Sequence, residues 1–277
     1  MGELGVVRKY YYWSDRKVRE IATNCDIPLN TRWAWSLKTP SVPYIGQVEV
    51  RQQQRNLRRN EVADKIETAI GRRAVEDLVS PPPVGFAKGV GHIEFARLPE
   101  TRAANDGAVM HIQTRNSLGV RVDVCLFGSM DNFWGRIQRA DYNPEGWASS
   151  AWYAIEELLA SHGQENTSQW DDEESRAVEA LKIALGQGVT TYVSEHRDRP
   201  WTRGFTIGSA EDTEWFADIY VDVELTKDRW DFSPAEPEYG AERILIGAPA
   251  WIRTASSAPV TFYHADTDRA RRRRARN

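Results

Sequence analysis

Three carboxylates and Tyr220 occupy alternate positions in one apolar stretch of the chain, residues 215–225. The acidic positions are Asp218, Asp222 and Glu224, and they alternate with the apolar residues Ile219, Val221, Val223 and Leu225. Successive side chains of an extended strand point to opposite faces, so we expect an acidic face and an apolar face. Carboxylate oxygens suit Mg²⁺ or Ca²⁺. The pattern predicts a solvated face neutralised by arginines of a neighbouring strand, or else a divalent metal site or a basic partner's docking face.

Two histidines offer a second candidate for metal or acid–base chemistry. His92 and Glu94 share one face of a predicted strand, and His111 lies on the strand expected beside it. If the two strands pair in register, these three side chains converge as metal ligands or as an acid–base group. The alternative is that each histidine is structural or simply exposed.

A polar loop at the end of a predicted strand is the best candidate for binding a ligand or partner. It contains Ser129, Asp131, Asn132 and Trp134. Binding residues tend to lie on loops that a rigid scaffold carries. The Gly-x-Ser-x-Gly elbow of α/β-hydrolases is missing from the sequence. The alternative is a turn that its own side chains stabilise.

Tryptophan is unusually abundant, with 11 residues against 3 methionines and 8 phenylalanines. Six of them fall in predicted loops or at the ends of elements: Trp33, Trp35, Trp134, Trp147, Trp170 and Trp201. Aromatic residues and arginine are enriched where proteins bind partners. These tryptophans therefore predict a recognition surface, with Trp33 and Trp35 as candidates beside the 129–134 loop. The alternative is that they pin loops onto the core.

The chain ends in a basic tail, residues 266–277. Its arginines are Arg269, Arg271, Arg272, Arg273, Arg274 and Arg276. The rest of the chain is acidic, whereas nucleic-acid-binding domains usually present a basic face. We therefore expect contact with nucleic acid or an acidic partner, if any, through this tail, which we expect to be disordered.

The elements that must position these residues alternate between strands and helices in two groups. Helices are predicted at 15–24, 52–79, 149–161 and 171–186. Strands are predicted between the second and third helices, at 91–98, 109–115 and 119–127. Further strands are predicted at 189–194, 204–207, 214–226, 243–246 and 260–263. Strands and helices that are partly segregated favour an α+β fold with largely antiparallel sheet.

Three local features refine this expectation. Prolines at 81–83 are expected to end the long helix, and the glycines of residues 85–91 are expected to form a flexible lead into the next strand. Asp171 and Glu174 have capping-box spacing. Halves at 1–148 and 149–265 repeat a helix-and-strand pattern, so we consider a pseudo-duplication within one compact unit.

The N-terminal residues resemble a known family. Its members begin with a tyrosine-rich strand followed by Ser-Asp-x-Lys-Val, which here corresponds to Lys9-Tyr10-Tyr11-Tyr12, Ser14-Asp15 and Lys17-Val18. The family is an uncharacterised group of actinobacterial proteins, a domain of unknown function. Two later segments, Phe127-Gly128-Ser129 and Leu245-Ile246-Gly247-Ala248-Pro249, resemble its other landmarks. Trp13 and Trp251 depart from the pattern, and the resemblance implies no activity.

Composition indicates a globular protein of one or two domains, since 277 residues with 41% hydrophobic and 27% charged side chains can bury a core. Two cysteines and no secretory or membrane-spanning segment predict a cytoplasmic protein. We expect a binding protein that uses Trp- and Arg-bearing loops and no cofactor, apart from a divalent metal in the case of the acidic strand or of His92, Glu94 and His111. The alternatives are a hydrolytic or nucleotide-processing enzyme and a nucleic-acid-associated protein.

Overall fold

The computed structural model describes residues 9–29, 45–98, 107–133, 152–162, 172–185, 205–254 and 261–262. The helices are α1 (Asp15–Asn24), α2 (Ile45–Ile70), α3 (Trp152–His162) and α4 (Glu173–Leu185). The strands are β1 (Lys9–Trp13), β2 (Ala74–Val75), β3 (Phe86–Leu98), β4 (Gly107–Arg115), β5 (Arg121–Ser129), β6 (Phe205–Glu224), β7 (Arg243–Thr254) and β8 (Thr261–Phe262). Helices and strands are both present, as an α+β fold requires.

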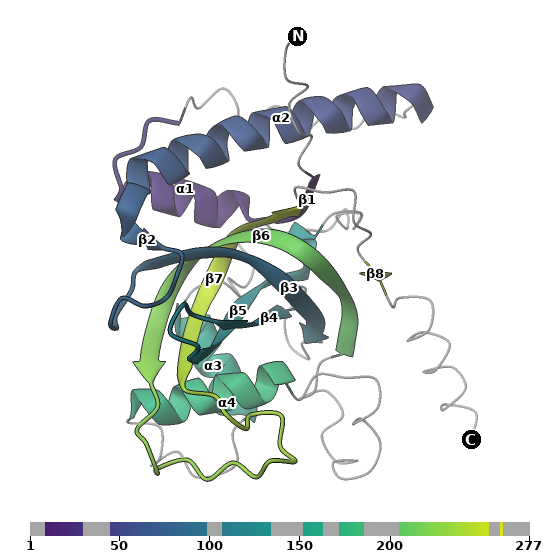
Figure 1. Ribbon diagram of the computed structural model, residues 1–277. Helices are drawn as coiled ribbons and strands as arrows, with labels where there is room; N and C mark the ends of the chain where they lie inside the picture. The colour runs from purple at the N-terminus through teal and green to yellow at the C-terminus, as the bar shows by residue number, and fades with distance from the viewer. Residues whose placement is uncertain are drawn as a thin grey trace, which may run out of the picture.

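Five strands close into a barrel in the order β7-β5-β4-β3-β6, because β6 also pairs with β7. The β5–β7 pair is parallel and the other four pairs of the barrel are antiparallel. The expected antiparallel sheet is therefore a closed, mixed barrel, in which β6 and β7 of the second half complete a sheet begun by β3, β4 and β5 of the first half. Figure 1 shows β6 and β3 arching across the barrel.

Apolar side chains from all five strands fill the barrel, and we call this set the interior core. It includes Phe95, Met110, Leu126, Trp215 and Leu245. The indole of Trp215 fits because Gly89 lies opposite, where a Cβ atom would come within 3.1 Å of the ring. Trp215 is thus an interior residue of the barrel. The glycines of residues 85–91 belong largely to β3, so the flexible lead predicted there is wrong.

The helices form two layers outside the barrel (Figure 1). α3 and α4 cover one side, where Leu159 and Leu181 meet Phe127, Val223 and other outward-facing strand residues in what we call the helix-side core. α1 and α2 cover the other side through a cluster that contains Ile21, Ile66 and Trp251. Trp251 is fully buried, stacked between Trp13 and Phe216.

The long helix ends earlier than predicted. α2 stops at Ile70, because Gly71 adopts a φ of +54° that lets the chain leave the helix without the steric cost of a Cβ atom. Ala74 and Val75 then form β2 beside β3. The prolines at 81–83 lie in the connection that follows, well after the helix has ended.

The strands predicted at 204–207 and 214–226 are one continuous strand, β6, which the pattern of side chains did not show because β-bulges interrupt it. One shift in register against β7 falls between Ile219 and Val221. An extra residue at a bulge switches the faces that the following side chains occupy. Ile219 accordingly belongs to the interior core, whereas Val221 belongs to the helix-side core.

No helix in the part of the chain that the structure describes is long and apolar enough to cross a membrane.

Candidate functional site

The polar turn at residues 129–132 is a rigid structure at the end of β5. Ser129 Oγ accepts a hydrogen bond from the Asp131 amide at 3.2 Å, and Met130 is buried beneath a single 3₁₀ turn. Asn132 Nδ2 donates to the Tyr12 hydroxyl at 3.0 Å, and Phe133 forms a bridge with Tyr12. The turn is therefore attached to β1 as well as to β5, and Trp134, which follows it, lies outside the described residues.

Tyr12 joins the turn to the barrel. Its side chain is fully buried. Its hydroxyl lies against Gly128, where an added Cβ atom would be only 2.1 Å from the oxygen. Burial raises the pKa of Tyr12 to about 12, against the lowering effect of hydrogen bonds with Asn132 and Ser129 and of the nearby charges of Arg16 and Lys17. The phenol stays protonated at neutral pH and cannot act as a base there.

Lys17, on the helix α1 that follows β1, forms a buried ionic cluster. Its side chain has no exposed surface, and its ammonium lies 3.0 Å from Asp218 Oδ2, 2.9 Å from Glu20 Oε2 and 2.5 Å from the Tyr220 hydroxyl. An ammonium has three hydrogens, and each has an acceptor here. Burial lowers the pKa of Lys17, but Asp218 and Tyr220 outweigh it and the pKa is raised. The ammonium is charged and fully engaged.

Local structure places Lys17 in that position. Ser14 caps α1, since its Oγ accepts a hydrogen bond from the Lys17 amide at 3.2 Å, and the Ser14 amide donates to Ala250 of β7. Lys17 also lies 5.0 Å from the centroid of the Tyr220 ring, which packs against Trp152 at 5.9 Å. The cluster thus connects α1, β6 and α3.

The acidic residues of β6 do not form one row. Asp218 pairs with Lys17, whereas Asp222 forms a two-point ion pair with Arg243, with nitrogen–oxygen distances of 2.8 and 2.7 Å. Glu224 is exposed at the end of the strand. The bulge between Ile219 and Val221 separates Asp218 from Asp222, so the single acidic face expected from the alternation is wrong.

The Asp222–Arg243 pair closes one end of the barrel. Arg243 also donates to the carbonyls of Leu78 and Ser80 at 2.8 and 2.7 Å, and the Val84 amide donates to Asp222 at 3.0 Å. Leu78 and Val84 in turn extend the interior core. This ion pair positions the connection between β2 and β3 and leaves neither partner's charge open to a ligand.

The histidines lie on paired strands but use different partners. Glu94 stands directly opposite His111, as the register prediction required. His111 nevertheless contacts Asp123 at 2.9 Å in a buried position where Arg121 also binds that carboxylate, whereas exposed His92 contacts Glu211 at 2.7 Å. Across the described part of the chain, no three His, Cys, Asp or Glu side chains are grouped closely enough to hold a metal ion.

Sequence reasoning missed Lys17, Tyr12, Tyr220 and Arg243. One signal was available for Lys17, which shares a face of α1 with Val18 and Ile21 and therefore needed a buried counter-charge. Cys125 is fully buried, and burial holds the pKa of its thiol well above the usual range. The six loop tryptophans and the arginine tail lie outside the described residues.

Comparisons with protein-family models, with curated proteins and with solved structures give no match to this chain. The resemblance of its N-terminal residues to the actinobacterial family stays a prediction.

Proposed function

We propose that this is a binding protein whose recognition surface lies beside β1, with the turn at residues 129–132 at its centre. The attachment of that turn to β1 through Asn132 and Tyr12 carries the proposal. A turn held at both ends presents Ser129, Asp131 and Asn132, all of them partly exposed, in one geometry. Binding to such a surface avoids the entropic cost of ordering a loop.

The filled barrel supports a surface site over an interior one. Its apolar side chains are close-packed across all five strands, and the buried cations Lys17, Arg243 and Arg121 each have carboxylate partners within the chain. Charged groups committed in this way hold elements together. Recognition is therefore assigned to side chains on the connections outside the barrel.

The exits of the tryptophan-bearing segments add support. Leu29, the last described residue before Trp33 and Trp35, packs against the cluster beneath α1 that contains Tyr10 and Trp13 of β1. Phe133, the last described residue before Trp134, is bridged to Tyr12 of the same strand. Both segments thus leave the described structure next to β1.

A paired substitution tests the proposal. Asp131→Ala lies in the turn, and Asp231→Ala, an equally simple loss of a carboxylate, lies on an exposed residue elsewhere. Each variant, a Trp134→Ala variant and the unchanged protein would be immobilised and exposed to extract of the source cells and to a panel of metabolites, with retained proteins and compounds quantified by mass spectrometry.

We expect Asp131→Ala and Trp134→Ala to reduce the retention of a specific partner or ligand about tenfold or more, which corresponds to about 1.4 kcal/mol of binding free energy, and Asp231→Ala to leave it unchanged. Equal retention by all four proteins would refute the proposed surface. Chemical conversion of a retained compound would instead favour the hydrolytic alternative.

We also place the protein in the cytoplasm. Cys25 and Cys125 are both free, which suits a reducing compartment.

A further inference from the structure

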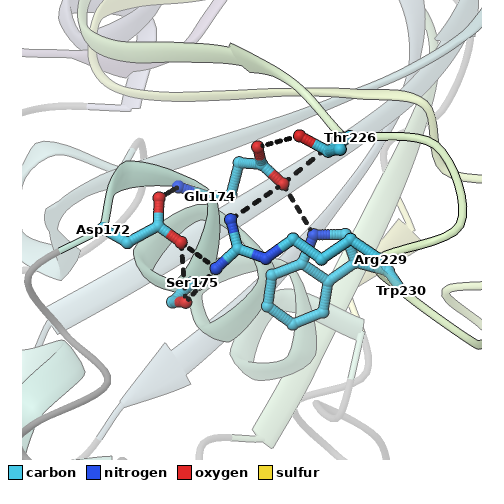
Figure 2. A network of polar contacts seen from close by, with 6 residues as sticks. All are labelled: Asp172, Glu174, Ser175, Thr226, Arg229 and Trp230. Atoms are coloured by element: carbon cyan, nitrogen blue, oxygen red, sulfur yellow. Dashed lines mark hydrogen bonds and ion pairs between the residues drawn. The ribbon is translucent and has the colours of Figure 1, made fainter.

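The connection between β6 and β7, residues 225–242, passes the N-terminal end of α4. It is attached to the rest of the protein at two places, one in each half of the connection. We call this segment the strap. Its first attachment is the network of side chains in Figure 2, which joins the start of α4 to the start of the strap. Its second attachment is Arg121 of β5. Figure 1 places the strap and α4 on the side of the barrel away from α1 and α2.

Glu174 is the centre of the first attachment (Figure 2). Its carboxylate accepts hydrogen bonds from the Thr226 amide at 3.1 Å, the Thr226 hydroxyl at 2.5 Å and the Trp230 indole at 2.8 Å, and it lies 3.4 Å from Arg229. This carboxylate therefore holds the strap, and the capping box predicted for Asp171 and Glu174 stays a prediction. Asp171 lies outside the described residues, and Asp172 accepts the Glu174 amide.

Asp172 completes this attachment. It accepts hydrogen bonds from Ser175 and from Arg229, whose guanidinium therefore lies between two carboxylates at the N-terminal end of α4. Arg229 also lies 5.0 Å from the centroid of the Trp230 ring. The contacts of three strap residues, Thr226, Arg229 and Trp230, thus depend on two acidic residues at one end of the helix.

Apolar rings follow directly in the strap. Trp230 and Phe232 stack with their planes 12° apart and pack, partly buried, against the helix-side core. The strap residues from 233 to 237 are exposed. The first half of the strap is therefore retained by the Glu174 network together with these two rings.

The second attachment is buried. Arg121 donates to the Tyr239 carbonyl at 2.6 Å and to the Pro237 carbonyl at 3.1 Å, and its own charge is neutralised by Asp123, which has no exposed surface. Arg229 and Asp172 of the first attachment are 40% and 39% exposed. Ion pairs open to water contribute less than buried ones, because water competes for the same groups.

We propose that the strap is a hinged latch, which opens at its first half while Arg121 holds its second half. Glu174 is the group that keeps it closed. Opening lifts Trp230 and Phe232 from the barrel and uncovers the part of the helix-side core beneath them. The inference is independent of the proposed binding surface, which uses other residues.

Hydrogen–deuterium exchange on the full chain tests the latch. The variants are Glu174→Gln, which removes the charge and one acceptor, and Asp172→Asn, which weakens the hold on Arg229. Glu173→Gln is the matched control, since Glu173 is an exposed neighbour of the same type that makes none of these contacts.

We expect amides of residues 226–236 to exchange about tenfold faster in Glu174→Gln and to a smaller extent in Asp172→Asn. Residues 238–242 and the barrel strands should keep the rates of the unchanged protein, as should the whole Glu173→Gln chain. If the strap and the barrel accelerate together, the strap does not open separately and the proposal is overturned. An unchanged rate in residues 226–236 also overturns it.

Discussion

The ammonium of Lys17 lies 3.0 Å from the carboxylate of Asp218, a residue 201 positions further along the chain. This contact joins the first helix to the long strand β6, and it occupies an acidic residue that the sequence pattern offered as a metal ligand. Because Lys17 is fully buried, the cluster around it contributes to stability and its disruption has a measurable cost.

Replacing Lys17 with methionine should lower the free energy of unfolding by about 3 kcal/mol, since Asp218 and Glu20 would be left facing each other without the cation. Urea denaturation followed by circular dichroism would measure the change, with Lys65→Met on the exposed side of α2 as the control. A loss below about 1 kcal/mol, the range of surface ion pairs, would show that the buried pair adds little.

Replacing Gly128 with alanine should destabilise the protein by about 1–3 kcal/mol, the usual cost of overpacking, because the new methyl group would overlap the Tyr12 hydroxyl. Adding Tyr12→Phe should restore part of the loss by removing that oxygen. Gly85→Ala, where a Cβ atom meets nothing within 4 Å, is the control. Additive effects of the two substitutions would contradict the predicted contact.

Alkaline pH should destabilise the protein through Tyr12. Its pKa is about 12 in the folded state against 10.0 for an ordinary tyrosine, so between these values only the unfolded chain releases the proton. The contribution of Tyr12 to the free energy of unfolding is fully present below pH 10. It falls as the pH rises toward 12, by about 1.4 kcal/mol per pH unit and about 3 kcal/mol in all. Urea denaturation from pH 9 to 11.5 should show a shallower decline for Tyr12→Phe than for the unchanged protein; equal declines would exclude this role.

The two acidic residues at the end of β6 should differ sharply in their effect. Asp222→Asn should cost about 3 kcal/mol or more, because Arg243 would remain buried with its charge uncompensated. Glu224→Gln, on the same strand but exposed, should change the free energy of unfolding by less than about 0.5 kcal/mol. Similar losses from the two variants would mean that the Asp222–Arg243 pair does not hold this end of the barrel.

The arginine tail provides a prediction that rests on charge alone. If residues 266–277 bind nucleic acid, the affinity for a 20-base-pair DNA duplex, measured by fluorescence anisotropy, should fall steeply with salt, with a log–log slope of about −0.9 for each phosphate neutralised. Deleting the tail should abolish binding. Affinity that is insensitive to the deletion would eliminate the tail as the nucleic-acid contact.

Much of the local structure was predictable because it depends on neighbours in the chain. The helix predicted at 15–24 is confirmed as α1, which Ser14 caps. The strands predicted at 109–115 and 119–127 are confirmed as β4 and β5. Side-chain periodicity and backbone preferences of a few adjacent residues are enough for such elements.

Other features depend on contacts between distant parts of the chain, and only the tertiary structure decided them. The β6–β7 pairing closes the barrel, and the bulge after Ile219 separates Asp218 from Asp222, although the alternation of residues 218–224 suggested one face. The pairing of Lys17 with Asp218 and of Arg243 with Asp222 likewise depends on contacts between distant parts of the chain. The order and partial segregation of the predicted helices and strands were enough for the α+β class. Which charges meet was decided by strand register, because a shift of one residue moves a side chain to the opposite face of the sheet.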